Sequence, residues 1–402
     1  MLFIMLRLFT RRKRIYLDYA AATPLLPEVR RSMEPFLRGG YGNPSAIHQE
    51  GQRARQAVEV ARATCARLLK VSRESVIFTG SGTESNNLAI FGLVRHLIDT
   101  GTDISDIEII TTRLEHPSVS EVVDQLAIQG VAIKYCPVDE TGKIIISELA
   151  QLLSKQTALV SFAYANSEVG TVQPVRKIVR MVEAYNREHG TAIKTHLDAA
   201  QAPLWLTCEV ERLGVDLMSL DAGKCNGPKG VGVLALRRGV HIQGVQRGGG
   251  QEFGLRAGTE NVAGIVGAAT ALELAQAGYE SRSAAVATLR DSFIHELQTI
   301  SGAVLNGHPT DRLANNVNIS IPGIDTEYAT VWLDTHGVAC STKSACSGAG
   351  GGGSRVVEAM TNDKAQAAST LRFSLGPETT AKEIKRTVTS LQQFLHINTK
   401  RI

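Results

Sequence analysis

The sequence lacks three features that would mark a specialised class of protein: paired cysteines, a strong net charge and long apolar runs. Its six cysteines are scattered and none forms a Cys-x-x-Cys pair, so neither a metal site, a redox pair nor a disulfide framework is indicated. The formal net charge is only +4, and no stretch of the body gathers Lys and Arg beside aromatic residues. We therefore expect no nucleic-acid partner and a reducing, cytoplasmic setting.

The amino terminus has an apolar segment, residues 1–8, followed by a basic run at residues 11–14. A secretory signal carries its charges first, so this order does not fit one. The apolar segment is also too short to cross a bilayer, and we expect no membrane association. A mitochondrial presequence and a misassigned start both stay open as explanations.

A length of 402 residues suits two domains, and 43% hydrophobic with 20% charged residues is ordinary for a globular protein. In the first two thirds, apolar runs typical of strands alternate with runs typical of helices. This alternation favours a mostly parallel α/β sheet. We expect strands at residues 75–79, 107–111, 132–136, 158–162 and 192–197, and helices at residues 84–98, 119–129 and 175–188.

The pattern changes at about residue 263, where an alanine-rich helix (265–277) leads into a second helix (283–300) and then a short strand (316–321). We place a boundary near Gly264. The predicted large domain is 17–262, and the small domain combines 1–16 with 263–402.

Two stretches place polar residues where α/β folds bind ligands. Residues 78–87 combine a strand end, a turn of small residues and a helix start, where the amides around Gly82 and Thr83 favour an anion such as phosphate. An ordinary turn with a Thr cap is the alternative, and the local pattern alone favours it. Asp198 ends a buried strand, where a carboxylate could keep a ring nitrogen protonated. A helix N-cap explains that residue equally well.

Three further residues stand in unusual surroundings. Lys224 lies among small residues, where a partly buried amine can form a Schiff base with an aldehyde cofactor, although a surface turn is the alternative. Arg372 lies inside an apolar strand and needs an anion, either a bound carboxylate or a structural ion pair. Cys346 precedes a glycine run, which indicates either a flexible functional loop or a linker with an incidental cysteine.

Together these motifs resemble the NifS/IscS-type cysteine desulfurases, a group of class-V aminotransferases among the fold-type-I enzymes that use pyridoxal 5'-phosphate (PLP). The resemblance covers nearly the whole chain, and the order of so many matches is specific. It implies a large PLP-binding domain with a mostly parallel seven-stranded sheet and a smaller α+β domain that carries the cysteine loop. The matching stretches are residues 16–21, 42–45, 83–87, 115–116, 168–171, 227–230, 248–252, 256–259 and 344–346.

The resemblance also implies residue roles. Lys224 would form the Schiff base, Asp198 would pair with the pyridine nitrogen, and His116 would stack on the ring and relay protons. The remaining roles are Gln201 at the ring hydroxyl, Thr83 and the amides around Gly82 at the phosphate, Thr259 at the phosphate of a neighbouring subunit, Ser167 near cofactor and substrate, Arg372 at the substrate carboxylate, and Cys346 as the nucleophile.

The activity implied is the conversion of L-cysteine to L-alanine, with a persulfide formed on Cys346. The sulfur would pass to an acceptor protein, either an iron–sulfur scaffold or a tRNA-thiolation enzyme, and the enzyme would be a homodimer. Cys340, by contrast, follows an apolar pair and is predicted to end a buried strand. Buried thiols stay protonated and react poorly.

Several positions depart from the family pattern. Asp221 and Gly223 replace the serine and histidine that commonly hold the phosphate, Ser167 replaces an asparagine, and Lys343 stands where glycine is common. A carboxylate near a phosphate is repulsive unless it is neutralised or turned away. A selenocysteine lyase, another PLP enzyme such as an aminotransferase, and a non-catalytic family member are the alternatives. The cysteine loop argues against an aminotransferase, and the joint retention of the reactive residues argues against a non-catalytic role.

Overall fold

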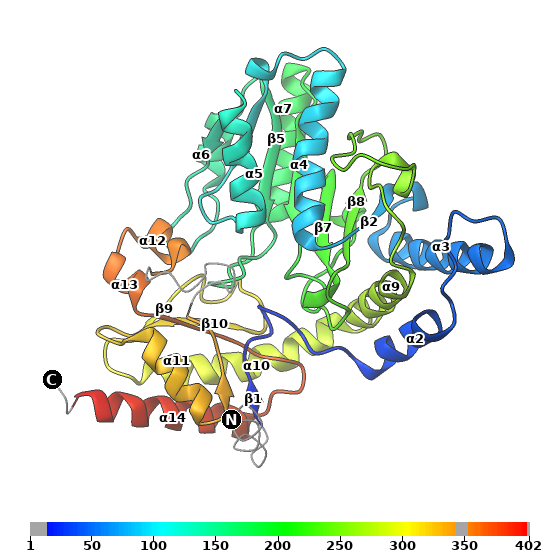
Figure 1. Ribbon diagram of the computed structural model, residues 1–402. Helices are drawn as coiled ribbons and strands as arrows, with labels where there is room; N and C mark the ends of the chain where they lie inside the picture. The colour runs from blue at the N-terminus through cyan, green and yellow to red at the C-terminus, as the bar shows by residue number, and fades with distance from the viewer. Residues whose placement is uncertain (1–13, 343–352, 400–402) are drawn as a thin grey trace.

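The computed structural model describes residues 14–342 and 353–399, and its larger lobe is built on one seven-stranded sheet (Figure 1). The strand order is β2-β8-β7-β6-β5-β3-β4, and β8 alone runs in the opposite direction to the other six strands. The mostly parallel sheet is therefore confirmed. Its strands are β2 (Val76–Thr79), β3 (Glu108–Thr111), β4 (Ala132–Tyr135), β5 (Thr157–Ala163), β6 (Lys194–Asp198), β7 (Leu217–Asp221) and β8 (Gly232–Leu236).

Successive strand residues point to opposite faces of this sheet, and apolar residues lie on both faces. Helices therefore cover both faces. In β2, Ile77 packs on the face covered by α4 (Gly82–Asp99) and α5 (Pro117–Ile128). Its neighbour Phe78 joins the core on the other face. That second face is covered by α3 (Gln49–Leu69), α6 (Ile146–Leu152), α7 (Val175–His189), α8 (Val210–Leu213) and α9 (Val262–Gln276).

The smaller lobe has its own antiparallel sheet of order β12-β10-β9 and its own apolar core. The strands are β9 (Val304–Leu305), β10 (Asn316–Ser320) and β12 (Thr370–Ser374), and β1 (Ile15–Tyr16) pairs in parallel with β11 (Val338–Ala339). The helices of this lobe are α10 (Tyr279–Gln298), α11 (Thr326–Thr335), α12 (Arg355–Thr361), α13 (Lys364–Ala368) and α14 (Ala381–Thr399). The short 3-10 helices of the chain are η1 (Arg73–Ser75), η2 (Ile104–Asp106), η3 (Ala222–Lys224) and η4 (Glu252–Gly254).

Two segments join the lobes. The chain enters through β1 in the smaller lobe and then continues as α2 (Pro27–Arg38), which packs against α9 of the larger lobe (Figure 1). Helix α9 itself contributes Ile265 to the core of the larger lobe and Ala275 to that of the smaller lobe. The proposed domain boundary after residue 262 thus falls at the start of a helix shared by both cores. No helix within residues 14–342 or 353–399 has the length and apolar character needed to cross a membrane.

Candidate active site

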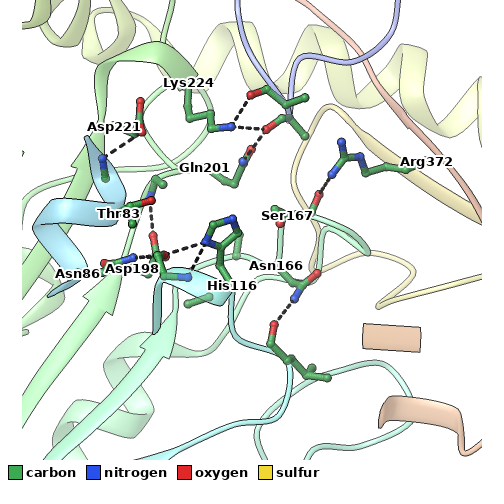
Figure 2. Close-up of a pocket in the computed structure, with 18 residues that line it drawn as sticks. Thr83, Asn86, His116, Asn166, Ser167, Asp198, Gln201, Asp221, Lys224 and Arg372 are labelled. Carbon is green, nitrogen blue, oxygen red and sulfur yellow. Dashed lines mark hydrogen bonds between the residues drawn. The ribbon is translucent and has the colours of Figure 1, made fainter. Parts of the chain in front are cut away.

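A cavity of about 150 Å³ lies where the carboxyl ends of β5, β6 and β7 meet the start of α4 and strand β12 (Figure 2). Parallel sheets place ligands at this edge, because the connecting loops leave a crevice there. The cavity collects eight of the ten site residues predicted from the sequence. These are Gly82, Thr83, His116, Ser167, Asp198, Gln201, Lys224 and Arg372.

Asp198 is the last residue of β6, and its carboxylate is held by two donors. One oxygen, Oδ1, accepts the amide of Ala200 at 3.0 Å, and Oδ2 accepts the side-chain nitrogen of Asn86 at 2.8 Å. The residue is 8% exposed and lines the cavity. The carboxylate therefore closes a local turn instead of capping a helix, and it offers a fixed, acceptor-only group to a ligand.

His116 stands at the start of α5 as its N-cap residue. Its Nδ1 accepts the amide of Ser118 at 3.1 Å and lies 2.8 Å from the Ser118 hydroxyl. Burial lowers the pKa of His116, and the carboxylate of Asp198 opposes that shift only in part. The imidazole is therefore neutral at physiological pH.

Lys224 ends the 3-10 helix η3 and reaches across to the segment that follows β1. Its Nζ donates to the carbonyl oxygen of Ala20 at 3.0 Å and also bonds to the carbonyl of Ala21. Gln201 donates to the same Ala20 carbonyl at 3.0 Å. The N-terminal segment thus positions the amine at the cavity wall (Figure 2).

The start of α4 differs from the expected phosphate cradle. Ser81, not Thr83, is the N-cap: its hydroxyl accepts the amide of Glu84 at 3.1 Å, and the Glu84 carboxylate accepts the amide of Gly80, the residue before the cap, at 2.7 Å. The carboxylate of Asp221 accepts the Gly82 amide at 3.1 Å. Asp221 is therefore not turned away, and it occupies an amide that an anion would use.

Arg372 is buried in β12 and serves two neighbours. Its Nη2 forms an ion pair with Asp18 at 2.9 Å, and its Nη1 donates to the carbonyl of Ser167 at 3.1 Å. The remaining nitrogen, Nε, is buried without a hydrogen-bond partner among the described residues. The sequence left open whether Arg372 forms a structural ion pair or binds a ligand. The structure shows the ion pair and also places Arg372 at the cavity wall.

Cys346 and Lys343 lie outside the described residues, but described residues on both sides of them are held by hydrogen bonds. Ser341 exchanges two backbone hydrogen bonds with Arg372, at 3.1 and 2.7 Å. At the other end Ser354 donates to the Glu168 carboxylate at 2.6 Å. The other five cysteines are free thiols, and burial raises the pKa of each, that of Cys340 to about 12. Cys340 directly follows strand β11, as predicted, but the strand is not fully buried and Cys340 is of intermediate exposure.

Comparison with known proteins places this site in a family. Residues 15–387 match the family model described as aminotransferase class-V. The cysteine desulfurase IscS of Dictyoglomus turgidum is 40% identical over 96% of this chain and 95% of its own length. The cysteine desulfurase NifS of Azotobacter vinelandii is 36% identical over 93% of this chain and 90% of its own length. The chain belongs to the NifS/IscS group of class-V aminotransferases.

Solved structures agree with this family assignment. A NifS-like protein superposes with a TM-score of 0.87 at 35% identity, covering 96% of this chain and all of the other. A structure of SspA in complex with cysteine gives a TM-score of 0.77 at 29% identity, covering 91% of this chain and all of the other. Members of this family generally depend on PLP.

Sequence reasoning did not single out three residues of this NifS/IscS site. Asn86 and Ser118 bridge Asp198 and His116, and Asp18 pairs with Arg372. Each lies within or beside a motif that was recognised, but polar residues so close to a motif give no separate signal. Thr259 is exposed and does not line the cavity of its own chain, so its predicted role across a subunit interface stays a prediction.

Proposed function

We propose that this chain is a PLP-dependent cysteine desulfurase that converts L-cysteine to L-alanine and carries the released sulfur as a persulfide on Cys346. The observation that carries the proposal is the convergence of Lys224, Asp198 and His116 on one cavity, in a chain whose relatives are named cysteine desulfurases. A structural neighbour that was solved with cysteine bound supports the choice of substrate.

The residues of the cavity fit the ring and aldehyde ends of PLP better than its phosphate end. An acceptor-only carboxylate, Asp198, suits a protonated ring nitrogen, and the Lys224 amine suits the aldehyde (Figure 2). At the phosphate end, Asp221 competes for the Gly82 amide. When bound, PLP supplies a ring that accepts the electron pair left by loss of the substrate Cα proton.

The chain's own residues would bind and orient the substrate around that cofactor. Arg372 would receive the substrate carboxylate, since its buried Nε has no partner in the described part of the chain and a guanidinium suits a carboxylate. His116 would exchange protons at Nε2, because Nδ1 is already occupied by Ser118. Ser167, whose carbonyl bonds Arg372, would line the substrate side.

The thiol chemistry leaves Cys346 as the sulfur acceptor. Nucleophilic sulfur is the thiolate, and burial keeps the other five cysteines protonated. The Cys346 sulfur would form a bond to the substrate sulfur while the substrate C–S bond breaks. L-Cysteine and a thiol give L-alanine and a persulfide, so the conversion balances without an external oxidant.

The partners proposed are a second copy of the chain and a sulfur acceptor protein. An iron–sulfur scaffold or a tRNA-thiolation enzyme would take the persulfide sulfur, and both fit a cytoplasmic enzyme. Thr259 supports the homodimer, since it is exposed and does not line its own cavity.

The test has a spectroscopic and a chemical part. The purified chain should absorb visible light through PLP bound at Lys224, and Lys224→Ala should lose that absorption. With L-cysteine, Cys346→Ala should keep the absorption yet release no sulfide, whereas Cys340→Ala should keep most activity. Mass spectrometry should find the added sulfur on the peptide that contains Cys346. A protein that stays colourless with added PLP, or a persulfide on Cys340, would refute the proposal.

A further inference from the structure

We propose that Ser118 and Asn86 are positioning residues that hold His116 as a neutral ring with its hydrogen on Nε2. A chain of hydrogen bonds runs from Asp198 through Asn86 and Ser118 to His116, with lengths of 2.8, 2.8 and 2.8 Å. Asn86 and Ser118 are 2% and 7% exposed, so no bulk water competes with these bonds. The donor and the acceptor of each of these three hydrogen bonds follow from one group that can only accept hydrogen bonds.

That group is the carboxylate of Asp198, and it fixes the amide of Asn86. An ionised carboxylate accepts hydrogen bonds and donates none, so the nitrogen of the amide must face it. The same nitrogen then directs its second hydrogen to the Ser118 hydroxyl oxygen. The amide oxygen of Asn86 is left buried without a partner within the described residues. A flipped amide could accept from the Ser118 hydroxyl, but its oxygen would then stand against the Asp198 carboxylate oxygen, two acceptors at hydrogen-bonding distance.

The orientation of Asn86 in turn decides the state of His116. The Ser118 oxygen already accepts from Asn86, so its own hydrogen is directed to Nδ1 of His116. The backbone amide of Ser118 donates to the same Nδ1 at 3.1 Å. A nitrogen that accepts two hydrogen bonds cannot carry a hydrogen, so the hydrogen of the neutral ring lies on Nε2.

This arrangement sets what His116 offers to a ligand. Nε2 has no hydrogen-bond partner within the described residues, and His116 lines the cavity (Figure 2). In this state the ring meets a ligand as a hydrogen-bond donor through Nε2. The amide of Asn86 does not pass protons along, so protons enter and leave the ring from the cavity side alone. The identity of that ligand rests on the proposed function, but the state of the ring does not.

The test reads the ring nitrogens of His116 directly. Histidine labelled with ¹⁵N is incorporated into the full chain, and ring nitrogen–proton correlations are recorded without substrate, with His116→Gln used to assign the signal. We expect a neutral ring with the hydrogen on Nε2. In Ser118→Ala and Asn86→Ala the protonation midpoint of His116 should rise, because a donor to Nδ1 is lost or misdirected. A hydrogen bond of ordinary strength corresponds to about a fivefold change, or about 0.7 pH unit.

Controls separate positioning from general damage. The charged groups that face His116 are Asp198, Asp221, Glu168 and Lys224, and none of them is altered in the two variants. Ser118→Thr keeps the hydroxyl and should restore the midpoint, and Ser120→Ala on the same helix should not move it. A wild-type ring with its hydrogen on Nδ1, or unchanged midpoints in both variants, would overturn the proposal. Because no turnover is measured, loss of the proposed desulfurase activity would leave this result intact.

Discussion

At the residue scale, Asp221 has the most direct effect on how well the cavity can hold an anion. Its two carboxylate oxygens accept the amides of Gly82 and Gly223, at 3.1 and 2.8 Å. A phosphate at the start of α4 would meet this negative charge at close range. For unit charges about 4 Å apart, the repulsion is about 4 kcal/mol at an effective dielectric constant of about 20.

Replacing this pair should strengthen cofactor binding. In Asp221→Ser with Gly223→His, the repulsion disappears and a phosphate partner is added. A Cβ at Gly223 would approach the Asp221 carboxylate at 3.1 Å, so removing that carboxylate also makes room. We expect the PLP dissociation constant, measured by visible titration, to fall at least tenfold, about 1.4 kcal/mol. Asp99→Ser, at the far end of α4, is the control. Unchanged or weaker binding would show that Asp221 does not oppose the phosphate.

Glu115 is a second residue whose charge matters, this time for stability. One oxygen bonds the Thr112 hydroxyl at 2.6 Å, and the other is buried without a partner within the described residues. Burial raises the pKa of Glu115 from 4.5 to about 8, and the nearby Asp198 adds to the shift. Between these two values the folded chain keeps a proton that the unfolded chain releases. Stability therefore declines as pH rises through this window.

Glu115→Gln should remove this decline, because the amide is neutral at every pH. The variant should gain stability relative to the wild type between about pH 5 and about pH 8, by a few kcal/mol at most. Urea denaturation at both pH values measures the difference. Glu121→Gln, exposed on α5, is the matched control. Parallel pH profiles of Glu115→Gln and the wild type would contradict the expected protonation.

At the element scale, the sequence predicted some elements well and others not at all. The five strands β2 to β6 and the helices α4, α5 and α7 appear within a few residues of their expected positions, because apolar runs typical of strands alternate there with runs typical of helices. The helix expected from Glu84 begins at Gly82, since Ser81 caps it. Strands β7 and β8 were not predicted individually. The two strands are joined by the 3-10 helix η3 and not by an α-helix, so the alternation of strand and helix does not mark them.

The site shows the same division between local pattern and tertiary contact. Motifs were enough to name eight residues that meet in one cavity. Sequence could not tell that Asp221 turns its carboxylate toward Gly82, nor that Asp18 reaches Arg372 across 354 positions of chain. Both contacts depend on which strands become neighbours, and spacing along the chain does not encode that.

Helix α12 offers a test of how an element holds the cysteine segment. Ser354 caps this helix by accepting the amide of Val357 at 3.1 Å, and it donates to the buried carboxylate of Glu168 at 2.6 Å. Glu168 directly follows Ser167, whose carbonyl bonds Arg372. Ser354, which lies just after the segment that contains Cys346, is therefore tied to the wall of the cavity.

Ser354→Ala should slow sulfur transfer to Cys346 more than it weakens cysteine binding. The loss of the cap costs about 1 kcal/mol, and the charge-assisted bond to Glu168 is lost as well. We expect kcat to fall about tenfold while the spectral titration with L-cysteine keeps its midpoint. Asp363→Ala removes the cap of the neighbouring helix α13 and should leave kcat nearly unchanged. Equal effects of the two variants would show that only general stability is involved.

At the scale of the whole molecule, the cavity depends on both lobes and on the segment between them. The larger lobe supplies Asp198, His116 and Lys224, and the smaller lobe supplies Arg372. Asp18, just after β1, pairs with Arg372, and two residues later the Ala20 carbonyl receives Lys224. Relative displacement of the lobes would therefore separate the proposed substrate clamp from the proposed cofactor amine. Neither lobe alone contains the site.

The proposed homodimer can be tested through Thr259. Thr259 is exposed and does not line its own cavity, although the family resemblance gives it a role at the phosphate. If it serves the partner's cavity, a heterodimer of Lys224→Ala with Thr259→Asp holds one intact site. It should show roughly half the wild-type activity per dimer, because a two-fold dimer has two equivalent sites and only one of them stays intact. The two chains are co-expressed with different tags and purified through both. Lys224→Ala with Asp198→Ala, two defects in the chains' own cavities, should be inactive. An inactive first heterodimer would place Thr259 at its own chain's site, and a monomeric active enzyme would remove the shared site altogether.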